Sequence, residues 1–140
     1  MEWARTLSND TVESNSGVNG GGIHIGDGAT VTLSNDTVEF NTANVIGGVG
    51  GDGGGVYVQA GATVTFCNDT VQHNTANATS GVGGYGGGIY VDPGPPIYTY
   101  TVTAVYIDSF TVAHTINNTD SSGTNGSTAN VNGMYILQKC

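Results

Sequence analysis

Hydrophobic and polar residues alternate along short stretches of this chain with a period of two. Residues 23–25 (Ile-His-Ile), 30–33 (Thr-Val-Thr-Leu) and 63–66 (Thr-Val-Thr-Phe) each place apolar side chains on one face and polar side chains on the other. β-Branched residues dominate these stretches, and turn-forming residues separate them, so the pattern predicts short β-strands. The density of glycine and β-branched residues argues against any helix of useful length.

The alternating stretches belong to a sequence unit that is written three times. One part of the unit is an Asn-Asp-Thr-Val segment, found at Leu7–Asn15 (LSNDTVESN), Leu33–Asn41 (LSNDTVEFN) and Phe66–Asn74 (FCNDTVQHN). Another part is a glycine phrase, found at Gly21–Ile25 (GGIHI), Gly54–Val58 (GGVYV) and Gly87–Val91 (GGIYV). Successive Asn-Asp-Thr-Val segments are 26 and then 33 residues apart, and the difference falls in a Gly-rich connection. A variable loop on a fixed unit is typical of solenoids.

A single unit cannot bury its apolar face, whereas stacked units can, because the same face recurs in the next copy. Equivalent strands lying side by side pair in parallel, about 4.8 Å apart. The sequence therefore predicts an all-β parallel β-helix (a solenoid) of about three to four coils. We expect three short strands per coil, with the Gly-rich loops on one corner.

The segment Gly20–Ala43, GGGIHIGDGATVTLSNDTVEFNTA, resembles the repeat of right-handed parallel β-helix surface proteins. These include polymorphic outer-membrane proteins, autotransporter-like adhesins and large extracellular repeat proteins of bacteria. Their hallmarks are a GGA-Ile/Leu/Val phrase and a Phe-x-x-Asn phrase, which take the forms GGGI or GGGV and Val-x-x-Asn here. The likeness covers Leu7–Val91. It implies a right-handed coil and an extracellular or cell-surface location, but such repeats identify a scaffold rather than an activity.

The regular copies end near residue 91, and the rest of the chain follows the unit only loosely. We expect one domain, with three regular copies over residues 1–91 and a degenerate fourth coil over residues 92–140 that contains a Pro-rich insert (DPGPPIY, 92–98) and a C-terminal strand. In this last part, residues 105–115 resemble the Asn-Asp-Thr-Val segment, and residues 133–136 (GMYI) resemble the glycine phrase. Neither end carries a recognisable cap, so we expect a fragment of an exported repeat protein or an assembling subunit that contacts itself through open coil ends or flanking repeats.

Charge is sparse and one-sided, since 11 acidic residues face only Arg5 and Lys139, giving a net charge of −9. This balance disfavours nucleic acid and anionic membranes as partners, because phosphate binding needs clustered cations. The chain has no apolar run long enough to span a membrane and no secretory-signal layout at its start. Cys67 and Cys140 show neither metal-ligand spacing nor a disulfide-framework pattern.

Two polar positions recur in every copy and are expected to form columns along the stack. Asn15, Asn41 and Asn74 are predicted to build an internal ladder in which each amide bonds the next, because a buried amide needs partners. Asp10, Asp36 and Asp69 allow two interpretations. Stacked carboxylates can hold a hard cation such as calcium, and Asn-Asp pairs also favour tight turns. We expect no cofactor if the column serves the turns, and calcium if it serves as a cation site.

A third column is aromatic, and it consists of the middle residues of the glycine phrases. His24, Tyr57, Tyr90 and Tyr135 are expected to point outward and form a stripe. Such a stripe can pack against sugar rings, or it can simply stabilise the sheet. Residues 47–53 (GGVGGDG) also match the first part of a calcium-binding nonapeptide, although a flexible glycine loop explains them equally.

These observations favour a structural or adhesive surface repeat module. The alternative is a glycan-binding or carbohydrate-active β-helix that uses the aromatic stripe and the aspartate column. Enzymatic activity is not expected, because polysaccharide cleavage needs clustered carboxylates and nearby bases, whereas His24, His73 and His114 are scattered and Arg5 and Lys139 lie at opposite ends.

Overall fold

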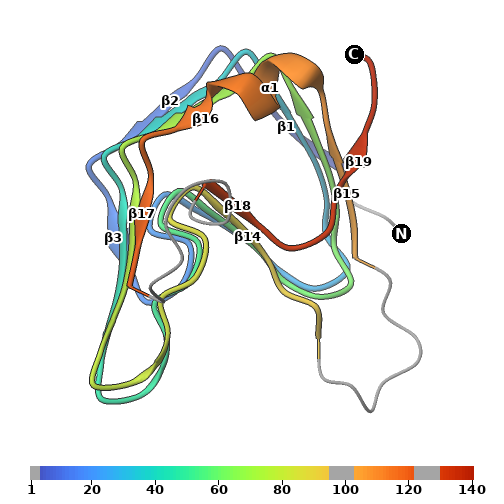
Figure 1. Cartoon of the computed structure of the whole chain (residues 1–140). Helices are drawn as coiled ribbons and strands as arrows, with labels where there is room; N and C mark the ends of the chain where they lie inside the picture. The colour runs from blue at the N-terminus through green and yellow to red at the C-terminus, as the bar shows by residue number, and fades with distance from the viewer. Residues whose placement is uncertain (1–3, 95–102, 122–129) are drawn as a thin grey trace.

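The computed structural model describes residues 4–94, 103–121 and 130–140, and regular structure in these segments is almost entirely β-strand (Figure 1). All strand pairings between these residues are parallel, and neighbouring strands in each sheet come from successive repeats. The all-β class and the parallel pairing predicted from the alternating pattern are therefore confirmed.

The chain passes through the sheets in the same order in each repeat. The first repeat contains β1 (Ala4–Ser8), β2 (Thr11–Glu13), β3 (Ser16–Gly17) and β4 (Ile23–Ile25). The second contains β5 (Thr30–Ser34), β6 (Thr37–Glu39), β7 (Thr42–Ile46), β8 (Val49–Gly50) and β9 (Val56–Val58). The third contains β10 (Thr63–Cys67), β11 (Thr70–Gln72), β12 (Thr75–Thr79), β13 (Val82–Gly83) and β14 (Ile89–Val91).

The number of strands per repeat was predicted wrongly, because the second and third repeats have five strands each rather than three. The two additional strands come from the stretches that follow the ladder asparagines. These stretches are rich in Ala, Asn and Gly and lack the alternation that marks the other strands, so no period of two reveals them.

Equivalent residues lie opposite one another in neighbouring repeats. Val31 pairs with Val64, and Val38 pairs with Val71. The sheets have the strand orders β1-β5-β10-β15-β19, β2-β6-β11-β16, β3-β7-β12-β17, β4-β9-β14-β18 and β8-β13. Because each shift by one repeat preserves the register, a side-chain type that recurs in the sequence becomes a column in space.

The last part of the chain keeps this order but replaces part of one repeat with a helix. It contains β15 (Ala104–Ile107), α1 (Ser109–His114), β16 (Thr115–Ile116), β17 (Thr119–Asp120), β18 (Val131–Asn132) and β19 (Ile136–Leu137). The sequence predicted no helix of useful length, and α1 is a short helix of six residues. The Asp108 side chain caps it by accepting the backbone N–H of Thr111 at 2.9 Å. Of the Pro-rich insert, residues 95–98 lie outside the described residues.

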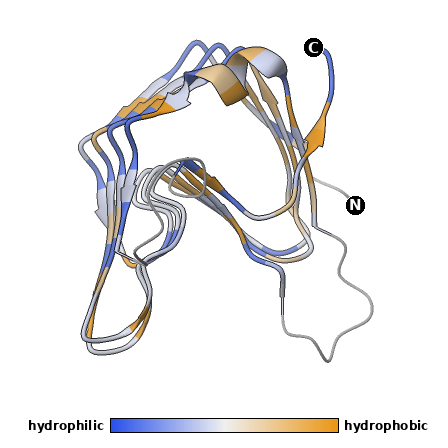
Figure 2. Cartoon of the chain, viewed as in Figure 1, coloured by the Kyte–Doolittle hydropathy of each residue, from blue (hydrophilic) through white to orange (hydrophobic). Residues whose placement is uncertain are grey.

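The hydrophobic core consists of aliphatic columns enclosed by the sheets. Leu33, Phe66 and Ile107 form one column and are fully buried, and Val56 and Ile89 belong to another. Figure 2 shows that hydropathy recurs from one repeat to the next, with polar corners aligned above polar corners. No buried side-chain nitrogen or oxygen among the described residues lacks a hydrogen-bond partner.

Three consecutive glycines in each repeat are needed for three different geometric reasons. In the second repeat, Gly53 has a left-handed backbone (φ +65°), which L-residues rarely adopt. A Cβ on Gly54 would collide with the backbone of Thr75. A Cβ on Gly55 would lie 2.9 Å from Nδ2 of Asn74, the ladder asparagine. The glycine phrase and the ladder therefore depend on each other sterically.

The Gly-rich connection forms a lobe beside the main stack, which we define as residues 44–53 and 77–86 (Figure 1). It leaves the stack through β7 and β12 and returns through β8 and β13, and Asn77 donates its amide N–H to Asn44 at 2.8 Å within it. The lobe carries three exposed aliphatic side chains, Ile46, Val49 and Val82. The first repeat is shorter at this corner, which accounts for the spacing of 26 rather than 33 residues.

A disulfide joins Cys67 at the end of β10 to Cys140, with their Cα atoms 5.7 Å apart and a sequence separation of 73. The sequence offered no pattern for this pairing, because stacking brings together residues whose separation depends on the lengths of the intervening repeats. Closing a loop of this size typically contributes about 2–5 kcal/mol to the free energy of unfolding. The bond ties the C-terminal segment across β15 to the third repeat.

Replacing Gly55 by alanine should destabilise the protein by about 2–4 kcal/mol, because the added Cβ displaces the Asn74 amide and the carbonyl of Gly88. The matched control is Gly26→Ala, since a Cβ there has only the Gln59 side chain within reach, at 3.9 Å. Urea unfolding monitored by circular dichroism measures the free energy of unfolding of both variants. Equal stabilities of the two variants would contradict the steric dependence.

Candidate functional site

The structure extends the asparagine ladder beyond the three predicted residues. Asn15, Asn41 and Asn74 lie in one column, where Nδ2 of each donates to Oδ1 of the next at 3.0–3.1 Å. Asn118 and Asn130 continue this column. Each interior amide also donates to a valine carbonyl of the preceding repeat, as Asn74 does to Val38 at 2.9 Å. The ladder thereby fills the polar corner with fully used amides.

The aspartate column uses its carboxylates to bind the backbone. Oδ1 of Asp69 accepts the backbone N–H of Asp36 at 2.8 Å, and Oδ2 accepts that of Cys67 at 2.9 Å. Asp36 repeats this arrangement toward Asp10. The preceding asparagines have left-handed backbones, as at Asn68 (φ +57°), which forms the corner. These bonds account for the column, and calcium at Asp10, Asp36 and Asp69 stays a prediction.

Burial affects the ionisation of the innermost aspartate. Asp69 is fully buried, and desolvation raises the pKa of its carboxyl to about 6, with the neighbouring carboxylates of Asp36 and Asp108 adding to the rise. The bonds from the backbone of Asp36 and Cys67 act in the opposite direction, because they stabilise the charged form. The carboxylate is thus a structural group whose charge costs free energy in the folded state.

The middle residues of the glycine phrases form an aromatic row on β4, β9 and β14. The rings of His24 and Tyr57 lie 4.9 Å apart between centroids, and those of Tyr57 and Tyr90 lie 5.6 Å apart. The row is less open than predicted. His24 is exposed and Tyr90 is half-buried, but Tyr57 has only 8% of its surface exposed.

The fourth predicted member does not join this row. Asn132 on β18 takes the position beside Tyr90, whereas Tyr135 immediately precedes β19, which pairs with β15 in a different sheet. The resemblance of GMYI to the glycine phrase was therefore misleading, because the regular repeat length is lost after residue 91.

A second column, which the sequence did not reveal, lies beside the aromatic row, and its last two members belong to the lobe. Asn19, Asp52 and Tyr85 occupy equivalent positions 33 residues apart. Oδ1 of Asn19 accepts the backbone N–H of Asp52 at 3.2 Å, and Oδ1 of Asp52 accepts that of Tyr85 at 2.9 Å. Asp52 is the acidic residue of the GGVGGDG stretch, and burial raises the pKa of its carboxyl. The constant spacing was the available signal, but the three residue types differ.

The aromatic row and the second column meet in a cluster of tyrosines and carboxylates. The hydroxyl of Tyr57 donates to Oδ2 of Asp92 at 2.7 Å, and the ring of Tyr85 stacks on that of Tyr90 at 6.1 Å. Burial is the main cause that raises the pKa of Tyr57, and the Asp92 carboxylate adds to it. Burial likewise raises the pKa of Tyr90 to about 12, helped by Asp52 and Asp92. The cluster carries two carboxylates and is electrostatically negative.

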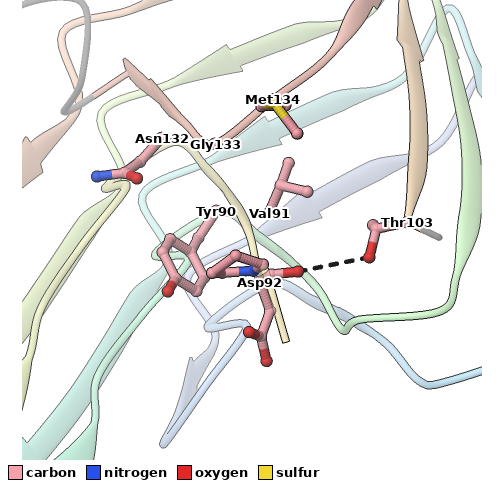
Figure 3. A pocket seen from close by; sticks show the side chains of 8 residues that line it. Tyr90, Val91, Asp92, Thr103, Asn132, Gly133 and Met134 are labelled. Atoms are coloured by element: carbon pink, nitrogen blue, oxygen red, sulfur yellow. Dashed lines mark hydrogen bonds between the residues drawn. The ribbon is translucent and has the colours of Figure 1, made fainter. Parts of the chain in front are cut away.

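A cavity of about 330 Å³ lies beside Tyr90, where the aromatic row ends (Figure 3). Its wall is mainly apolar and includes Val91 and Met134, and Asp92, Thr103 and Asn132 also line it. The Asn132 amide points away from Val91 and Met134 (Figure 3). The Thr103 hydroxyl donates to the carbonyl of Asp92 at 3.4 Å. This concave surface with few, fixed polar groups is the candidate binding site of the described part of the chain.

Comparison of the chain with family models, with curated proteins and with solved structures gives no match. Within the described segments, no three His, Cys, Asp or Glu side chains are grouped so that they could hold a metal ion. In the same segments, no helix combines the length and the hydropathy of a membrane-spanning helix. The columns and the cavity are therefore the features of this chain that bear on its function.

The unfolding free energy should fall as the pH rises from about 4 to about 6, because the folded-state pKa of Asp69 lies above that of the unfolded chain. The stabilising contribution of the protonated group is fully present below pH 4 and is lost as the carboxyl ionises. Asp69→Asn should flatten this part of the profile, and Asp27→Asn at an exposed turn should not. Urea titrations at several pH values measure the free energy of unfolding. The same pH dependence in the unmodified chain and in both variants would contradict the role of Asp69.

Proposed function

We propose that this chain is a structural, adhesive repeat module of a surface protein, built as a right-handed parallel β-helix of about three to four coils. The observation that carries the proposal is the set of polar columns in register, above all the asparagine ladder from Asn15 to Asn130. Such columns fix a rigid rod of repeats, and their bonds are directed along the stack rather than toward a reacting group.

The resemblance of Gly20–Ala43 to surface repeat proteins supports an extracellular or cell-surface location. The distribution of polar side chains supports a role without catalysis. His24 lies on β4, His73 follows β11, and His114 ends α1, so these bases belong to different parts of the stack. Sparse charge and a net charge of −9 suit a solvated surface that does not attract nucleic acid.

The first repeat offers an edge on which a further repeat of the same pattern can stack. Asp10 and Asn15 are exposed, whereas their equivalents Asp36 and Asn41 are almost completely buried beneath the first repeat. Arg5 opposes such stacking. It pairs with Val31 in β5 and so places a charge in an aliphatic column, a device that discourages strand edges from pairing.

Surface location is tested by labelling intact cells of the producing organism with antibodies against the folded chain. We expect labelling without permeabilisation and loss of the signal after external protease treatment. An antibody against a cytoplasmic protein is the control for cell integrity. Labelling that requires permeabilisation would contradict the proposed location and, with it, the adhesive role.

Replacing Arg5 by valine should promote end-to-end association, because it completes the aliphatic column with Val31 at the exposed edge. Burying one valine side chain lowers the dissociation constant by about tenfold or more. Thr6→Val is the matched control, since Thr6 is the next residue along the same strand and pairs with Thr32. Sedimentation velocity over a concentration series measures association, and monomers throughout for Arg5→Val would contradict the stacking edge.

A further inference from the structure

The C-terminal segment, residues 133–140, adds the last strand to the sheet that begins with β1 (Figure 1). Within it, β19 pairs with β15 over only two positions. The backbone N–H of Gln138 donates one further bond to the carbonyl of Ile107 at 3.1 Å. The segment therefore covers a strand edge whose N–H and C=O groups would otherwise be open to pairing with another strand.

Side-chain packing holds this segment only weakly. Ile136 and Leu137 of β19 are 54% and 65% exposed. Phe66 and Ile107, which precede Leu137 in the same column, are fully buried. Hydrophobic stabilisation scales with the apolar area that is removed from water, so β19 gains much less from packing than β10 and β15 do.

The Cys67–Cys140 disulfide adds a covalent attachment to these few contacts. Cys67 ends β10, which is not the neighbour of β19, so the bond passes across β15 and ties the segment to the next strand of the sheet. Cys140 is exposed and Cys67 is half-buried. The bond is therefore open to attack by small thiols from the solvent, because thiol–disulfide exchange requires access to a sulfur.

The segment also closes one side of a cavity of about 280 Å³ at the end of the stack. Val112 and Val131 line this cavity and pack against the hydrophobic core. Tyr135 is the lining residue that the C-terminal segment supplies. Departure of the segment would thus uncover the edge of β15 and the apolar end of the core together.

The repeats themselves do not depend on this segment. The asparagine ladder runs from Asn15 to Asn130 and ends before residue 133. The aliphatic residues of β5 and β10 pair with each other, and those of β10 pair with β15. The interactions that set the register of the stack therefore remain when the segment leaves.

We infer that residues 133–140 form a redox-controlled cap, which the Cys67–Cys140 disulfide holds on β15 and which a dithiol releases while the repeats stay folded. One thiolate of the dithiol attacks Sγ of Cys140, the S–S bond breaks, and Cys67 leaves as a thiolate that takes up a proton. The second thiol of the reagent then displaces Cys140. The dithiol ends as a disulfide and both cysteines end as thiols, so two electrons have passed to the protein.

The cap is tested by hydrogen exchange on the full chain, followed by NMR with and without dithiothreitol. In the oxidised chain the Gln138 amide should exchange at least about tenfold more slowly than in an unstructured peptide, and reduction should abolish this protection. The Thr70 amide, which donates to the carbonyl of Asp36 at 2.9 Å within the stack, should stay protected. Equal Gln138 rates in the two forms would overturn the inference, and so would loss of protection at Thr70.

The double variant Cys67→Ser/Cys140→Ser separates the effect of the bond from that of the reagent. Without dithiothreitol, its Gln138 amide should exchange as fast as in the reduced chain, and adding the reagent should change nothing further. Ser34→Ala is the matched control, since Ser34 pairs with Cys67 on the neighbouring strand, and it should keep the slow exchange. Slow exchange of Gln138 in the double variant would overturn the inference, as would a double variant whose melting curve shows no folded repeats.

This outcome is distinct from that of the proposed surface role. The cap depends only on the contacts of β15, β19 and the disulfide, and cell labelling does not report on them.

Discussion

The hydrogen bond between the amides of stacked asparagines is the interaction on which the rest of the structure depends. Each interior amide uses its nitrogen twice and its oxygen twice, as Asn74 does with Asn41, Asn118 and Val38. A buried amide that loses such partners costs about 1–3 kcal/mol, so the corner has little freedom to slip. The third glycine of each glycine phrase, Gly55 in the second repeat, lies against this amide. Register is therefore set by a polar column, and the aliphatic columns fill the space that it defines.

The sequence predicted the structural features that recur in every repeat. It did not predict those in the part of the chain where the regular repeats end. Alternation in residues 30–33 and 63–66 predicted the strands, and the recurrence of Asn15, Asn41 and Asn74 placed the ladder. Asn118 was not found, because it lies in a part of the chain where a short helix capped by Asp108 replaces strand residues. The Cys67–Cys140 bond was equally hidden, since no local pattern records a contact between distant repeats.

The candidate site was predictable only in part, for a related reason. Tyr57 and Tyr90 share a position in the repeat, so their stacking follows from the period alone. Their partners Asp52 and Asp92 have no such signature. Asp52 belongs to a column of three dissimilar residues, and Asp92 follows the last regular strand. The cavity exists because the order of the stack breaks down beside Tyr90.

The lobe shows how such a scaffold can diversify. Seven more residues at this corner in the second and third repeats than in the first leave the pairing of β5 with β1 and with β10 equally regular. Chain length at this corner is therefore uncoupled from the register of the interior. Loops of other lengths and compositions can be exchanged there without redesign of the core, which makes the lobe a natural location for sequence drift and for grafted epitopes.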